Sequence, residues 1–219
     1  MNGKKIIQIL AGEYYTVALD DDGKAYILRS KTICLSNIGN ELKGKKIISI
    51  SVGYAHIVAI DERGKVYTFG ANNYGQLGDV TTDGSEVPIC ISNKENELKG
   101  KKIISISAGE NHTVALDEEG KVYAWGNNEY GQLGDGTTTN SPLPICISDK
   151  ENELKGKRII SISAGEAHTV ALDEEGKVYT WGYNRCGQLG DGTTNGGSLL
   201  PICISNKENE LKGKRIVWC

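Results

Sequence analysis

The chain has 219 residues, 28 of them glycine, with 38% hydrophobic and 24% charged residues and a formal net charge of −3. This composition excludes a collagen-like helix, which needs glycine at every third position, and a long disordered chain, which has far fewer apolar residues. The chain lacks the excess of basic residues that would favour direct binding to nucleic acid. No apolar run approaches the roughly 18 residues of a membrane-spanning helix. The N-terminal apolar run is too short for a secretory signal. We therefore expect an intracellular protein without a membrane partner, most simply a cytoplasmic one, with the nucleus as an alternative.

An internal repeat organises the whole chain. A Gly-Lys-Lys-Ile-Ile phrase or a close variant recurs at Gly3, Gly44, Gly100, Gly156 and Gly213, which gives a period of about 56 residues after a shorter first step. We expect a single domain over residues 1–219, with repeat units 1–43, 44–99, 100–155 and 156–212. The first unit is shortened and degenerate, because it lacks the Gly-Gln-Leu-Gly phrase of the others. Residues 213–219 are expected to form a closing strand or a truncated one.

The third unit shows which elements to expect in each repeat. Apolar residues alternate with a period of two, which is typical of strands, and Ile104, Ile106 and Ala108 are predicted to share one face. Gly120 ends a short turn between two strands, and a Gly-rich loop precedes the last strand. We predict strands at 103–108, 112–117, 122–125 and 144–148. Four short antiparallel strands at this period are typical of the blades of a β-propeller, so the predicted fold is all-β.

One long phrase in the repeat resembles a known family. The pattern AGxxHTVALxxxGxVYxWGxNxxGQLG at 108–134 and 164–190, and more loosely at 52–78, closely resembles the repeat of the regulator of chromosome condensation family, also found in alpha-tubulin suppressor-like proteins. The resemblance implies a propeller, commonly of seven blades, and a role in binding. Its founding member is an exchange factor for the small GTPase Ran that also docks on nucleosomes. Other members are scaffolds, ubiquitin-ligase targeting modules or enzyme inhibitors.

This chain departs from that family in two respects. It holds about four units, so we expect a partial or open propeller, with the first unit as a cap. A fragment of a longer propeller, and two arcs that self-associate into a ring, are alternatives. No unit carries a long insertion comparable to the β-wedge with which the exchange factor opens its GTPase, which disfavours exchange activity.

Most residues that suggest chemistry recur once per unit, and recurrence favours a structural role. This applies to the three histidines, His56, His112 and His168, and to four of the six cysteines, Cys34, Cys90, Cys146 and Cys203. It also applies to the acidic turns that end in glycine, at residues 20–23, 61–64, 117–120 and 173–176. The acidic turns are too short for a calcium loop, and the Gly-Gln-Leu-Gly phrases lack the Lys-Ser/Thr of a phosphate loop. We therefore predict no catalytic, cofactor-binding or metal-binding residue and no enzyme activity.

Positions that differ between otherwise similar units are the candidates for partner binding. Three of them precede the second strand of a unit, namely Tyr54, Asn111 and Ala167. The others follow the third strand, namely Asn72, Asn127, Tyr183, Glu129 and Arg185. Loops on rigid scaffolds carry recognition, although drift after duplication produces the same pattern. The predicted function is a non-catalytic protein–protein interaction scaffold with another protein, such as a small GTPase, as partner. A guanine-nucleotide exchange factor and a chromatin-binding module are the alternatives.

Overall fold

The computed structural model describes residues 4–14, 16–28, 30, 32–206 and 216. Within these ranges the chain forms four antiparallel sheets of four strands each, and in every sheet the strands follow their order in the sequence. We call the sheets blades 1 to 4. Their strands are β1 (Ile6–Ala11), β2 (Thr16–Asp20), β3 (Ala25–Leu28) and β4 (Ile33–Cys34); β5 (Ile47–Val52), β6 (His56–Asp61), β7 (Val66–Gly70) and β8 (Ser85–Cys90); β9 (Ile103–Ala108), β10 (His112–Asp117), β11 (Val122–Gly126) and β12 (Ser141–Cys146); and β13 (Ile159–Ala164), β14 (His168–Asp173), β15 (Val178–Tyr183) and β16 (Gly197–Cys203).

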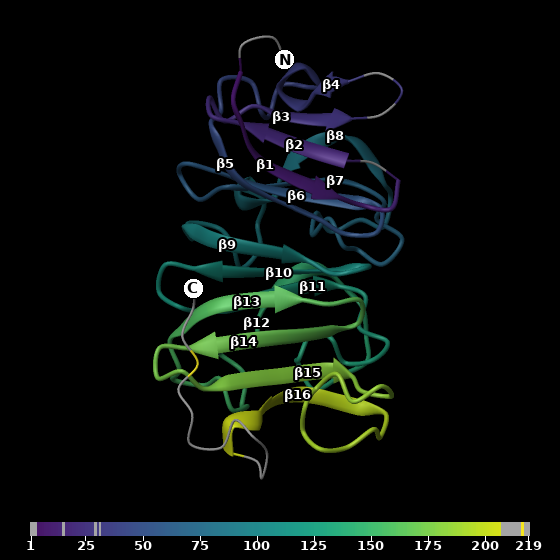
Figure 1. Ribbon diagram of the computed structural model, residues 1–219, viewed down its shortest axis with the longest axis vertical. Helices are drawn as coiled ribbons and strands as arrows, with labels where there is room; N and C mark the ends of the chain where they lie inside the picture. Colours follow the sequence, from purple (N-terminus) through teal and green to yellow (C-terminus); the bar gives the residue numbers. More distant parts are fainter. Residues whose placement is uncertain (1–3, 15, 29, 31, 207–215, 217–219) are drawn as a thin grey trace.

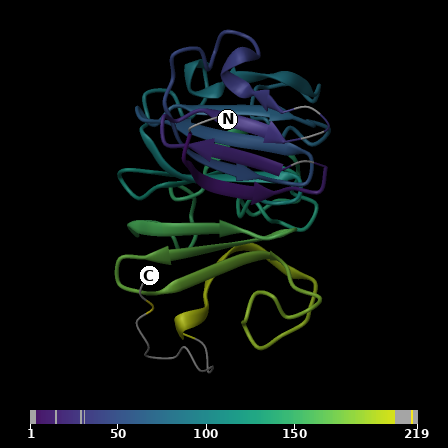
Figure 2. The ribbon, with the colours of Figure 1, turned by 45° about the horizontal axis from the view of Figure 1, so that its top comes forward.

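The blades lie one after another in an open row. Figure 1 shows blade 1 at the top and blade 4 at the bottom, and the turned view in Figure 2 keeps these two blades at opposite ends. Short 3-10 helices follow the last strand of blades 1, 2 and 4: η1 (Leu35–Asn37), η2 (Ile91–Asn93) and η3 (Ile204–Asn206). The prediction of an all-β, partial propeller with four-stranded blades is therefore confirmed. Among the described residues, no helix is long and apolar enough to cross a bilayer.

The second strand of a blade is buried on both faces. All six residues of β10 are buried, because β9 and β11 flank the strand and neighbouring blades cover its faces. The apolar clusters bridge blades: Val66 of blade 2 belongs to the same cluster as Ile106 and Tyr123 of blade 3. A single blade cannot bury its apolar faces alone, and stacking supplies the core.

The predicted face of Ile104 is wrong. In β9 the pairing shifts between Leu116, opposite Ser105, and Asp117, opposite Ile103, so Ile104 is the extra residue of a bulge. Ile104 is therefore 47% exposed, whereas Ile103 is 1% exposed. The third and fourth strands also differ by a few residues from prediction, since β12 begins at Ser141 and ends at Cys146.

The acidic turns close the second hairpin of each blade. In blade 3, the Asp117 carboxylate accepts hydrogen bonds from the backbone N–H groups of Glu119 and Lys121 and from the Tyr123 hydroxyl, at 3.0, 2.9 and 3.0 Å. The carboxylate oxygens are thus occupied within the turn. The interpretation of the acidic segments as hairpin turns is therefore confirmed.

A backbone hydrogen bond begins each new blade on the turn of the preceding one. The N–H groups of Ile103 and Ile159 donate to the carbonyls of Gly64 and Gly120, both at 3.0 Å. The Ile216 N–H makes the same contact with Gly176 O at 3.2 Å. Apart from Ile216, the predicted strand at 213–219 lies outside the described residues.

Candidate interaction surface

Two kinds of loop meet at one end of every blade. The turn between the first and second strands lies beside the long loop that follows the third strand, and in blade 3 the Asn127 N–H donates to Asn111 O at 2.8 Å. We call this the loop end; it lies on the right in Figure 1. The opposite end carries the acidic turns and the charged linkers. The variable residues predicted to bind a partner all come from segments at the loop end.

Two of the three histidines, His56 and His112, are structural, as predicted. His56 Nε2 lies 3.0 Å from Thr113 Oγ1, and the Thr113 hydroxyl donates to Gln76 O at 3.0 Å. Because the hydroxyl has a single hydrogen, His56 must donate its Nε2–H to Thr113. Trp125 Nε1–H donates to the same Gln76 carbonyl at 2.9 Å. This hydrogen-bond chain links blade 2 to blade 3.

An equivalent chain links blade 3 to blade 4. His112 Nε2 lies 3.1 Å from Thr169 Oγ1, and Thr169 and Trp181 both donate to Gln132 O, at 2.8 and 2.9 Å. Burial lowers the pKa of His56 to about 4 and that of His112 to about 3. Both imidazoles are therefore neutral at physiological pH, and they serve as hydrogen-bond donors between blades.

Asn72 and Asn127 have buried side chains, so they do not present a surface to a partner. Asn72 Nδ2 donates to Asp79 Oδ1 and Thr81 O, at 3.1 and 3.0 Å, and its Oδ1 accepts from Leu77 N at 2.9 Å. Asn128 makes the corresponding bonds in blade 3. Asn72 thus matches Asn128 and not Asn127, and it holds the long loop closed. For Asn72 and Asn127 the predicted contact role is therefore wrong.

The remaining candidates are at least partly exposed, and they form two groups. Glu129 and Arg185 lie on the long loops of blades 3 and 4, and Tyr183 ends β15. The Tyr183 ring meets Tyr130 edge-on with ring centres 4.8 Å apart. Asn111 accepts a hydrogen bond from Gln76 Nε2 at 3.2 Å. Tyr54 forms the second group by itself, at a depression lined by the first turns of the blades.

A depression of 370 Å³ at the loop end is formed by the first turns of all four blades. Its rim carries Glu13, Tyr54, Glu110 and Glu166. Backbone hydrogen bonds step from blade to blade across it, from Tyr54 N to Glu110 O at 3.1 Å and from Glu110 N to Glu166 O at 3.2 Å. We call it the central depression.

The central depression is acidic and bordered by tyrosines. Within the part of the chain that the structure describes, no lysine, arginine or histidine forms an ion pair with Glu13, Glu110 or Glu166. Tyr14 and Tyr54 meet edge-on, their hydroxyl oxygens are 2.9 Å apart, and this hydrogen bond together with Glu13 raises the pKa of Tyr54 to about 12. Sequence reasoning missed these glutamates because it matched Tyr54 with Asn111 and Ala167, whereas its structural equivalents are Glu110 and Glu166. The signal was available as a glutamate that follows Ala-Gly in three units.

The described residues contain no group of three His, Cys, Asp or Glu side chains that could hold a metal ion. The repeated cysteines end the fourth strand of each blade, where Cys90, Cys146 and Cys203 are buried and Cys34 is half-buried. Their interpretation as small strand residues is confirmed. Cys186 is exposed, and Cys219 lies outside the described residues.

Repeated four-stranded blades, stacked in an open row and linked at two junctions by equivalent hydrogen-bond chains, define an arc of a β-propeller. The sequence model of the RCC1-like domain matches residues 30–219, so the chain belongs to that family. The resemblance inferred from the repeat is thereby confirmed.

Relatives and solved structures agree with this assignment. The chain is 40% identical over 128 residues to the human E3 ubiquitin-protein ligase HERC2, covering 58% of this chain and 2% of the relative. It is 36% identical over 151 residues to the canine X-linked retinitis pigmentosa GTPase regulator, covering 68% of this chain and 14% of the relative. Among solved structures, Prp20p from Saccharomyces cerevisiae superposes with a TM-score of 0.73 at 23% identity, covering 93% of this chain and 52% of Prp20p. The chain thus spans a small part of these relatives and about half of the solved propeller.

Proposed function

We propose that this chain is a non-catalytic protein-interaction module whose central depression binds a basic segment of a partner protein. The observation that carries the proposal is the convergence of Glu13, Glu110 and Glu166 on one depression beside exposed tyrosines. The Asp117 carboxylate and the Nε2 atoms of His56 and His112 make hydrogen bonds within and between blades. Three different sequence units thereby place three negative charges in one concave surface.

The chemistry of the depression favours a lysine- or arginine-bearing partner. Unpaired carboxylates at the rim attract cations, and low ionic strength strengthens this attraction because salt screens exposed charges. Tyrosine rings add apolar contact area and cation–π attraction for a basic side chain. The solved structure of Prp20p is described together with its binding properties to Gsp1p and histones. Both proteins are therefore suitable probes.

The test measures binding of purified core histones and of a Gsp1-type GTPase to the chain. A variant with Glu13→Gln, Glu110→Gln and Glu166→Gln is compared with a control in which Glu118, Glu119 and Glu175 at the opposite end become glutamine. We expect the rim variant to bind at least about tenfold more weakly, corresponding to about 1.4 kcal/mol, and the control to bind as the original chain does. Equal losses in the two variants, or no binding of either probe at about 50 mM salt, would refute the proposal.

The second candidate is a guanine-nucleotide exchange factor. It is favoured by the name of the canine relative, a GTPase regulator, and by the description of Prp20p with Gsp1p. The same GTPase preparation, loaded with a fluorescent nucleotide, distinguishes the candidates. Accelerated nucleotide release in the presence of the chain would support exchange activity, whereas binding without accelerated release supports the interaction module.

A further inference from the structure

The long loop of one blade packs on the next blade in a recurring way. At the junction of blades 2 and 3, the Gln76 carbonyl accepts Trp125 Nε1–H, and the Val80 N–H donates to Pro142 O at 3.0 Å. At the junction of blades 3 and 4, the Gly136 N–H donates to Leu199 O at 3.0 Å. Leu133 of this loop is buried in the same apolar cluster as Trp181. Each of these junctions is thus completed by a leucine-bearing turn.

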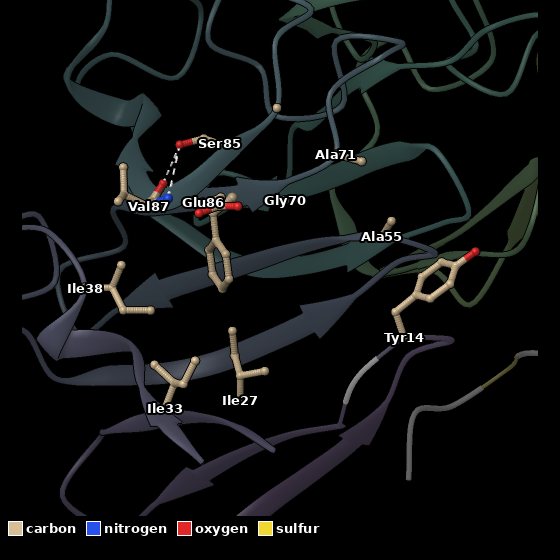
Figure 3. Close-up of a pocket in the computed structure, with 12 residues that line it drawn as sticks. Tyr14, Ile27, Ile33, Ile38, Ala55, Gly70, Ala71, Ser85, Glu86 and Val87 are labelled. Atoms are coloured by element: carbon tan, nitrogen blue, oxygen red, sulfur yellow. Dashed lines mark hydrogen bonds between the residues drawn. The ribbon is translucent and has the colours of Figure 1, made fainter. Parts of the chain in front are cut away.

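Blade 1 has no such loop. β3 ends at Leu28 and β4 begins at Ile33, so the segment between them is far shorter than in the other blades. A cavity of 720 Å³ lies where the loop would pack. Its lining is mostly apolar and comes from both blades: Ile27, Ile33 and Ile38 of blade 1, and Phe69, Glu86 and Val87 of blade 2 (Figure 3). We call it the junction pocket.

Side chains at this junction have lost the groups that would bind the missing loop. Phe69 stands where Trp125 donates its indole N–H, and Ile57 stands where Thr113 donates its hydroxyl. Ile27 replaces Thr68, whose hydroxyl binds Leu77 O at 2.7 Å. A buried donor without an acceptor destabilises the folded state, and these replacements avoid that loss. The pocket is therefore a coherent apolar surface that stays stable while open.

Blade 2 nevertheless keeps the backbone that receives a loop. The Ser85 hydroxyl donates to Val87 O at 2.7 Å, as Ser141 does to Leu143 O at 2.7 Å in blade 3 (Figure 3). The carbonyl equivalent to that of Pro142 belongs to Glu86, which lines the pocket. Glu86 also places an exposed carboxylate where the other blades have apolar side chains, and Figure 3 shows it in the lining of the pocket.

We propose that the junction pocket binds a turn of a partner protein that carries an apolar side chain, leucine or similar, next to a lysine or arginine. The turn takes the place of the missing loop: its apolar side chain enters among Ile27, Ile33 and Phe69, a backbone N–H meets Glu86 O, and its cation pairs with the Glu86 carboxylate. A peptide is the occupant because the two equivalent surfaces are both covered by chain segments. In blade 4 the residue equivalent to Glu86 is Leu199, which packs on Gly131 of the blade 3 loop. That loop carries Glu129 two residues before Gly131, so Glu86 disfavours it by like charge.

The probe is a cyclised, fluorescent peptide with residues 127–139 of this chain in which the exposed Glu129 is replaced by arginine; the unaltered sequence is the comparison peptide. Cyclisation reduces the entropy lost on ordering the turn. We expect saturable binding of the arginine peptide to the whole chain, at least about tenfold tighter than that of the unaltered peptide. Glu86→Lys should invert the preference, whereas Glu62→Lys, in an exposed turn at the opposite end, should not.

A second variant keeps the proposal testable independently of charge. Val87 is exposed, so Val87→Trp is compatible with folding and places a bulky, uncharged side chain at the pocket. We expect it to abolish binding of both peptides with an unchanged far-UV spectrum. Absence of saturable binding to the original chain, or equal binding of both peptides to the Glu86→Lys variant, would overturn the proposal. The rim variant of the central depression should bind the arginine peptide normally, which separates this site from the proposed function.

Discussion

The packing of glycine against tryptophan between blades gives a quantitative prediction. Gly78 has φ of +74°, and a Cβ added there would lie 2.8 Å from Trp125 Nε1. Gly156 has the same φ of +74° with no atom within 4 Å of such a Cβ. The two positions therefore differ in their surroundings and not in their backbone conformation. Gly78→Ala and Gly156→Ala form a matched pair.

The two substitutions share one energetic term and differ in a second. A left-handed backbone with a Cβ costs about 1–2 kcal/mol in both variants. At Gly78 the methyl group also displaces the Trp125 ring, which is buried and donates to Gln76 O at 2.9 Å. Overpacking of this kind costs about 1–3 kcal/mol. We expect Gly78→Ala to lower the free energy of unfolding by about 2–5 kcal/mol, and Gly156→Ala by about 1–2 kcal/mol.

Urea unfolding followed by tryptophan fluorescence measures both values. Trp125 reports directly on the junction, because its ring loses its buried environment when blades 2 and 3 separate. Comparable m-values in the two variants are required for the comparison of free energies. If the two variants agree within about 0.5 kcal/mol, the contact between Gly78 and Trp125 does not restrain the junction, and the reasoning is refuted.

Three further predictions follow from the hydrogen-bond chains and the loop anchor. The free energy of unfolding should fall between pH 6.5 and 5 by roughly 2–3 kcal/mol per pH unit. The reason is that burial lowers the pKa values of His56 and His112 to about 4 and 3, whereas the histidines of the unfolded chain take up protons below about pH 6.5. In urea titrations at a series of pH values, His56→Gln should halve this slope. Thr113→Val should cost about 1–3 kcal/mol in urea unfolding, since it removes the acceptor of the His56 Nε2–H, and Thr113→Ser should restore most of the loss. Asn72→Ala should cost about 2 kcal/mol or more, whereas Asn73→Ala, at an exposed neighbouring position, should stay within about 0.5 kcal/mol; equal melting temperatures of the two variants would contradict the anchor role.

The period of the sequence predicted the blades well, because strand alternation and turn glycines are local signals. The bulge at Ile104 was not predictable from alternation, since one added residue reverses the face of a side chain without changing the pattern of residue types. The anchor role of Asn72 was missed because comparison by appearance matched it with Asn127, one position away from its structural equivalent Asn128. Local spacing could not show either error.

The candidate sites depend on contacts between units, and these lie beyond the reach of a local pattern. The rim residues Glu110 and Glu166 are 56 residues apart in sequence, Glu13 lies further away still, and only stacking of the blades brings them to one depression. The junction pocket arises from a deletion in one unit together with replacements such as Phe69 in the next. The shortened first unit was visible in the sequence, but the cavity that it leaves required the structure.

The unequal junctions also have a mechanical consequence. Blades 2 and 3 are joined by two hydrogen bonds to Gln76 O, and blades 3 and 4 by two hydrogen bonds to Gln132 O. Because hydrogen bonds are directional, they resist both sliding and separation of the blades. At the first junction Ile57 and Phe69 supply packing in place of those donors, and packing tolerates small rotations far better than a hydrogen bond does. We therefore expect the array to behave as a stiff body of blades 2 to 4 with a compliant joint below blade 1. Whatever binds at that joint sets the angle of the first blade.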